Sequence, residues 1–190
     1  MIKYVLTVLI LTVLFSCNSN NTTDAKSGSR QDSVNKKISA EKSDSASLKK
    51  TGFYTLVGDS VMVPPFEIEI SLSPKAKKRI TDSSETIIVD VLLSGTPKDS
   101  SNLDEMGSFF VGSAEREITY GQIARFDNVK FPKKMYDELA DKDVDLNLNV
   151  YTGRKSSQFN LITGDLLFDK LSNVINKRFT LNEKLIYGDD

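Results

Sequence analysis

The stretch DVDLNLNVY, from Asp143 to Tyr151, decides the fold class because apolar and polar residues alternate along it. Successive side chains of a β-strand point to opposite faces of the sheet. The apolar residues from Val144 to Val150 therefore share one face, and the polar residues between them share the other. This pattern predicts a strand with one face in a hydrophobic core and the other in water.

The same period of two recurs in FEIEISL (66–72), ETIIVDVLLS (85–94) and RFTLNEKLI (178–186). In 85–94 both faces carry apolar residues, which predicts a strand in the middle of its sheet. In 178–186 the inward residues are Phe179, Leu181 and Leu185. Weaker strands are expected at 53–57, 61–63, 108–112, 116–120, 124–131 and 159–162. Together these segments predict an all-β fold, an antiparallel β-sandwich of about seven to nine strands.

Short helical connections are expected between the strands. In SPKAKKRI (73–80) Ser73 is a candidate N-cap and Pro74 suits the first turn. Pro132 likewise begins PKKMYDELA (132–140). GDLLFDKLSN (164–173) is interpreted as a third helical turn.

The N-terminus has the layout of a secretory signal. Lys3 precedes an apolar run from Tyr4 to Phe15, and this run is shorter than the roughly 20 residues that span a bilayer. The run ends in LFSC, which resembles the lipobox of bacterial lipoproteins. That resemblance implies cleavage after Ser16, so that 1–16 is the signal peptide, and lipidation of Cys17. A signal peptide cleaved elsewhere, or a buried apolar segment, is the alternative.

Residues 17–50 form a separate region of different composition. They are rich in Ser, Asn, Lys and Asp and contain no aromatic residue. Such a segment cannot bury enough apolar surface to offset the entropy of ordering it. It is therefore interpreted as a disordered tether, and 51–190 as the β-sandwich domain.

A lipobox, a tether and a sandwich of this size resemble the small transthyretin-like outer-membrane lipoproteins, a group that includes the lipoprotein of type VI secretion complexes. The domain residues behind the resemblance are ETIIVDVLLSG (85–95) as an early core strand and IARFDNVKFP (123–132) before a helix. The resemblance implies a lipid anchor in the outer membrane and envelope proteins as partners. Whether the domain faces the periplasm or the cell exterior stays open.

Composition argues against several classes of function. The 190 residues include no His and one Cys, which excludes Ser-His and Cys-His catalysis and His-metal sites. With 25 Lys and Arg against 26 Asp and Glu, the chain lacks the basic excess of a nucleic-acid-binding protein. No Gly-rich phosphate loop follows a strand, and no motif pairs two carboxylates. Neither an enzyme nor a cofactor is expected.

Asp141, Asp143 and Asp145 alternate in the manner of a calcium loop. An EF-hand loop needs Gly at its sixth position and Glu at its twelfth, where this chain has Leu146 and Thr152. The three aspartates are therefore interpreted as a solvated strand edge, and no metal site is predicted.

Two basic segments are the candidate partner-binding residues: Lys75, Lys77, Lys78 and Arg79 in the first helix, with Arg154 and Lys155 in a predicted turn. If 108–120 forms one bulged strand, an even count of antiparallel crossings brings both segments to the same end. If it forms two strands, they separate into unrelated solvated surfaces. A ligand of this turn would be a phosphate, a carboxylate or an acidic protein; the alternative is a soluble hairpin tip without a ligand.

Phe109 and Phe110 are adjacent in a predicted strand, so they point to opposite faces and one can be exposed; packing within the domain is favoured for both. These observations favour a non-enzymatic, lipid-anchored interaction or structural component of an envelope complex, such as a secretion-system accessory. A surface glycan-binding or ligand-binding lipoprotein, and a periplasmic inhibitor or immunity protein, are the alternatives.

Overall fold

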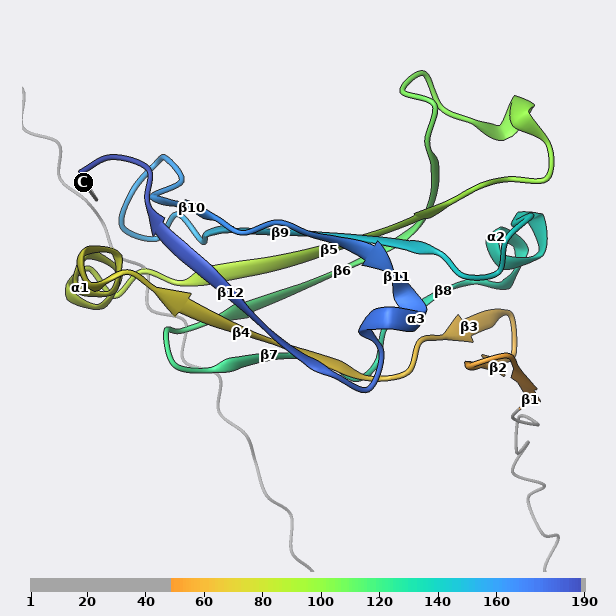
Figure 1. Ribbon diagram of the computed structural model, residues 1–190, viewed down its shortest axis with the longest axis horizontal. Helices are drawn as coiled ribbons and strands as arrows, with labels where there is room; N and C mark the ends of the chain where they lie inside the picture. Colours follow the sequence, from red (N-terminus) through yellow and green to blue (C-terminus); the bar gives the residue numbers. More distant parts are fainter. Residues whose placement is uncertain (1–48, 189–190) are drawn as a thin grey trace, which may run out of the picture. The chain divides into compact units, whose positions relative to one another are not determined.

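The computed structural model describes residues 49–188, and strands dominate them (Figure 1). The strands are β1 (Lys49–Thr51), β2 (Tyr54–Val57), β3 (Ser60–Met62), β4 (Phe66–Leu72), β5 (Ile87–Gly95), β6 (Phe109–Ile118), β7 (Ile123–Phe126), β8 (Lys130–Pro132), β9 (Asp145–Thr152), β10 (Ile162–Gly164), β11 (Leu167–Lys170) and β12 (Arg178–Leu185). The helices are α1 (Pro74–Asp82), α2 (Lys133–Glu138) and α3 (Leu171–Val174), with a short 3-10 turn at Ser100–Asn102. The all-β prediction is confirmed.

Two four-stranded sheets form the sandwich, with strand orders β10-β12-β4-β7 and β11-β9-β5-β6. Figure 1 shows the sheets as two layers. The alternating apolar residues point between them as the sequence predicts: Phe66, Ile68 and Ile70 from one sheet, and Val89, Val91 and Leu148 from the other, belong to one buried cluster. Strand β5 lies between β6 and β9, which confirms its predicted central place.

A third sheet, β1-β2-β3-β8, extends one end of the sandwich together with α2 (Figure 1). Strand β4 begins beside this sheet and ends at α1, so α1 lies at the opposite end. Strand β1 begins at Lys49, two residues before the predicted start of the domain. Residues 1–48, with Cys17 and almost all of the predicted tether, lie outside the described residues.

One strand pairing departs from the antiparallel prediction. Strand β12 inserts between β10 and β4 and runs parallel to β4, with Arg178 opposite Glu67. The Arg178 guanidinium donates to the Glu67 carboxylate from Nε at 2.8 Å. The two strands lie more than 100 residues apart in sequence, so local patterning carries no signal of their direction.

The predicted helical turn at 164–173 is wrong over its first part. Leu167–Lys170 is strand β11, which pairs antiparallel with β9, and only Leu171–Val174 is helical. The apolar residues at 166, 167, 168 and 171 fit either period in such a short segment. This segment becomes a strand because it pairs with the exposed edge of β9.

Residues 109–118 form the single strand β6, with an irregularity in register opposite Leu93 and Ser94. The condition under which the two basic segments share one end is therefore met. Phe109 is buried, whereas Phe110 on the other face is 52% exposed. The two rings therefore point to opposite faces as expected, and the favoured packing within the domain applies to Phe109 and not to Phe110.

Candidate functional site

The basic helix α1 and the turn 153–157 meet at one end of the sandwich. Ser73 caps α1 as predicted, since its Oγ accepts a hydrogen bond from the amide of Ala76 at 3.1 Å. Ala76 and Ile80 are buried, so the lysines and arginine of α1 point outward. The turn joins the segment that follows α1 because the Gly153 amide donates to the Thr86 carbonyl at 2.9 Å. We call Lys75, Lys77, Lys78, Arg79, Arg154 and Lys155 the basic end.

A buried carboxylate holds the turn in place. Glu85 is 2% exposed and accepts hydrogen bonds from the amide of Lys155 at 2.9 Å and from the amide and hydroxyl of Ser156 at 2.7 and 2.6 Å. The Thr86 amide also donates to it at 3.1 Å. Burial by itself would raise the pKa of Glu85, but the bonds from Ser156, Lys155 and Thr86 outweigh it and lower that pKa to about 2.

Glu85 occupies donors of this turn that had been considered for an external ligand. One interpretation of this turn was that its donors bind an external phosphate or carboxylate, but the donors of Lys155 and Ser156 bind Glu85. The carboxylate they bind belongs to the domain itself. An external ligand of the basic end would therefore have to use side chains other than Ser156. Whether the neighbouring cations are already neutralised by ion pairs decides which of them could bind such a ligand.

Several cations of the basic end already have anionic or aromatic neighbours. Lys78 pairs with Asp82 at 2.6 Å, and Lys155 pairs with Glu117 at 3.0 Å. The ammonium of Lys77 lies 5.4 Å from the centre of the Tyr120 ring. Among residues 49–188, no ion pair involves Arg79 or Arg154. These two arginines are the cations best placed to bind a partner.

Arg79 borders a shallow hollow of about 340 Å³. Its other lining residues are Ser157, Phe159, Asn160, Leu161, Leu185 and Tyr187. Phe159 is 77% exposed and Tyr187 87% exposed. The sequence did not indicate these two rings, because Phe159 was expected in a strand and Tyr187 follows the last predicted strand. Their common exposure beside Arg79 becomes visible only after β10 and β12 pair.

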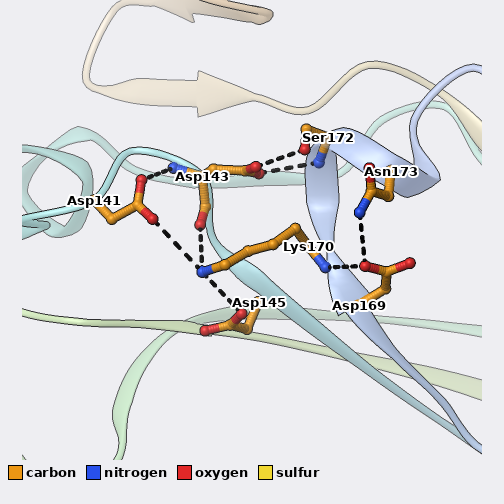
Figure 2. A network of polar contacts seen from close by, with 7 residues as sticks. All are labelled: Asp141, Asp143, Asp145, Asp169, Lys170, Ser172 and Asn173. Carbon is orange, nitrogen blue, oxygen red and sulfur yellow. Dashed lines mark hydrogen bonds and ion pairs between the residues drawn. The ribbon is translucent and has the colours of Figure 1, made fainter.

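The three aspartates of the predicted strand edge surround a lysine rather than a vacant space (Figure 2). The Lys170 ammonium lies 3.0 Å from the Asp145 carboxylate and 3.7 Å from that of Asp141, and it donates to the Asp143 carbonyl at 3.1 Å. The Asp143 carboxylate instead accepts from the amide and hydroxyl of Ser172, at 3.0 and 2.5 Å.

This network ties the start of β9 to β11 and α3. Only Asp145 lies in a strand; Asp141 and Asp143 belong to the preceding loop, so the expectation that all three share one strand face is wrong. Within residues 49–188, no group of three or more His, Cys, Asp or Glu side chains is arranged to hold a metal ion.

The structure pairs two carboxylates that no motif had connected. Asp90 on β5 lies directly opposite Glu115 on β6, and the Tyr151 hydroxyl donates to Glu115 at 3.1 Å. Burial, and then the charge of Glu115, raise the pKa of Asp90. The pair stands on the outer face of its sheet.

A third acidic residue, Glu183, is not among the candidates that the sequence motifs indicate. Its position on β12 continues the inward series of Phe179, Leu181 and Leu185, and it is 3% exposed. Burial, and then the charge of Asp165, raise the pKa of Glu183 to about 7. The signal was present in the sequence, since a charged residue interrupts the apolar face of a predicted strand.

None of the helices in residues 49–188 is long and apolar enough to cross a membrane. Comparison of the chain with protein-family models, with characterised proteins and with solved structures gave no match.

Proposed function

We propose that this protein is a lipoprotein of the bacterial cell envelope, anchored through Cys17 to the outer membrane. Its domain acts without catalysis and presents the basic end to an acidic protein partner within an envelope complex, such as a secretion apparatus. The anchor is inferred from the apolar run and the LFSC motif. The contact with an acidic partner is inferred from the basic end of the domain.

One observation supports the contact more than any other. Arg79 and Arg154, which lack ion pairs among residues 49–188, come from α1 and from the turn 153–157 and lie at the same end as Phe159 and Tyr187. Exposed aromatic rings beside arginines are typical of the residues that contribute most to protein interfaces. An acidic surface would complement these charges and would be steered towards them.

The position of this end also suits an anchored domain. The described chain begins at β1, in the sheet at one end, whereas the basic end lies beyond the other end of β4 (Figure 1). A tether leading to β1 would therefore attach at the end opposite the proposed contact. A partner can reach the basic end without passing the attachment point.

We test the contact by crosslinking in living cells, followed by purification of the full, lipidated chain and identification of the proteins that accompany it. The variant is R79E/R154E, and the matched control is K134E, because Lys134 is an exposed cation on α2 at the opposite end. Both variants are first checked for an unchanged thermal unfolding midpoint, since Arg154 lies within the turn that Glu85 holds.

We expect a reproducible set of envelope proteins with the wild type and K134E, and its loss with R79E/R154E. Removing the rings with F159A/Y187A should weaken recovery in the same way. Equal recovery from R79E/R154E and K134E would refute the contact. The absence of any protein partner, together with retained binding to a glycan array, would favour the glycan-binding alternative. A single toxin or enzyme as the partner would favour the inhibitor.

A further inference from the structure

Glu183 is a buried carboxylate for which the described residues supply no hydrogen-bond donor. It is 3% exposed, and within residues 49–188 both of its carboxylate oxygens are buried without a hydrogen-bond partner. Glu85 is equally buried but accepts bonds from Thr86, Lys155 and Ser156. A buried carboxylate without donors destabilises a fold unless another group compensates it.

Glu183 lies at the edge of the core, next to a hollow in the surface. On β12 it stands between Gly164 of β10 and Leu72 of β4. A Cβ placed on Gly164 would come within 2.8 Å of Glu183 Oε2, so the carboxylate lies directly against this glycine. The hollow measures about 550 Å³, and its lining residues are Ser71, Leu72, Ser73, Gly164, Asp165, Asn182, Glu183 and Lys184.

A second carboxylate borders the same hollow. Asp165 follows β10, and its Oδ2 accepts hydrogen bonds from the amide and the Nδ2 of Asn182, both at 2.9 Å. These bonds fix the carboxylate beside β12 while engaging only one of its oxygens. Its charge acts on Glu183 and adds to the effect of burial on the pKa of that residue.

We propose that the hollow between β10, β12 and the start of α1 binds one divalent cation of the calcium or magnesium class, with Glu183 and Asp165 as its charged ligands. Carboxylate oxygens are the ligands that these hard cations prefer, and water completes their coordination. The cation would provide the partner that Glu183 lacks and would neutralise the repulsion between the two carboxylates.

The edge of the sheet gives the ion access. Strand β10 is three residues long and forms the outer strand of its sheet, and Gly164 is exposed. A small displacement of this strand would open the carboxylate of Glu183 to the hollow. Because the site offers two charged ligands and one of them, Glu183, must first be opened to the hollow, we expect a dissociation constant of about 0.1 to 1 mM, as in weak extracellular calcium modules.

The test uses the full chain, purified in detergent and freed of metal with EDTA. Calcium chloride and magnesium chloride are titrated separately by calorimetry at about pH 8, where Glu183 is ionised, and the thermal unfolding midpoint is followed in parallel. The variants are E183Q and D165N. The control is E69Q, because Glu69 is an exposed carboxylate on β4 and does not line the hollow.

We expect one ion bound per chain and a higher unfolding midpoint with the ion in wild type and in E69Q. D165N should bind at least tenfold more weakly, and E183Q should show neither heat nor stabilisation. E183Q should also unfold at a higher temperature than the metal-free wild type, which shows that the variant is folded. If neither ion binds the wild type at millimolar concentration, or if E183Q binds as well as E69Q, the proposal is wrong and a proton alone compensates Glu183.

Discussion

Two glutamates buried within residues 49–188, Glu85 and Glu183, have opposite acid-base properties because only Glu85 has hydrogen-bond donors among these residues. Glu85 is 2% exposed and Glu183 3% exposed. Hydrogen bonds to Glu85 outweigh its burial and lower its pKa to about 2, whereas burial and Asp165 raise the pKa of Glu183 to about 7. Burial alone therefore does not determine the charge of a carboxylate; the donors within reach determine it.

These shifts predict how stability depends on pH. Because the folded pKa of Glu183 lies above its ordinary value of 4.5, the folded state holds the proton more tightly, and stability rises as the pH falls from about 7 to 4.5. Because the folded pKa of Glu85 lies below 4.5, its contribution is complete above that pH and is lost between 4.5 and about 2. Each shift corresponds to about 3 kcal/mol.

We therefore expect metal-free protein to be most stable near pH 5. Urea unfolding across the pH range measures this directly. E183Q should remove the rise in stability between pH 7 and 4.5, and E85Q should remove the fall below 4.5 while destabilising the protein at neutral pH. A profile of E183Q that parallels the wild type above pH 5 would contradict the assignment to Glu183.

At the scale of elements, the turn 153–157 requires a glycine at position 153 for space and not for a positive φ angle. Glycine is typical of tight turns because it tolerates positive φ, yet the residue with positive φ in this turn is Arg154, at 59°. Gly153 is needed for space, because a Cβ there would stand 2.0 Å from the Thr86 hydroxyl and 3.0 Å from a Glu117 oxygen. The close approach brings the turn to Glu85.

We predict that G153A destabilises the domain by about 1 to 3 kcal/mol, in the range of substitutions that overpack a site. The measurement is urea unfolding, combined with a double-mutant cycle. In a T86A background the nearest clashing atom, the Thr86 hydroxyl oxygen, is absent, so G153A should lower the free energy of unfolding by less than it does in the wild type. An equal loss of unfolding free energy in both backgrounds would mean that the Thr86 hydroxyl is not what excludes a side chain at position 153.

The secondary structure of the segment 164–173 is decided by the strand with which it pairs. Its apolar residues suggested a helix, but β11 pairs with β9, and Lys170 then reaches Asp141 and Asp145 (Figure 2). Two of the alternating aspartates thus bind the Lys170 ammonium through their carboxylates, and Asp143 binds it through its carbonyl. Their role follows from a residue about 25 positions later in the chain, which no local motif could identify.

At the scale of the molecule, the basic end is a product of topology. Its two segments lie more than 70 residues apart and meet because β6 is one strand and because Glu85 accepts the amides of the turn. The same arrangement places β1 at the other end. The described chain therefore begins at the end of the sandwich opposite the proposed contact.

The anchor itself gives a prediction for the whole chain. Replacing Cys17 by Ser removes the thiol that the LFSC motif offers for lipidation, so C17S should move from the membrane fraction to the soluble fraction of cells. Fractionation with antibody detection measures the change, and S19A is a control in the neighbouring polar tract. Unchanged membrane partitioning of C17S would contradict the lipid anchor.

The sequence by itself determined the all-β class, the central place of β5, the capped helix α1 and the inward face of each long strand, because these properties depend on periodicity and on contacts within a few residues. Only the tertiary structure decided the parallel pairing of β12 with β4, the strand at 167–170, the end that Arg79 and Arg154 share, and the burial of Glu183 beside Asp165. These properties depend on which distant segments pack together, and packing is set by the chain as a whole.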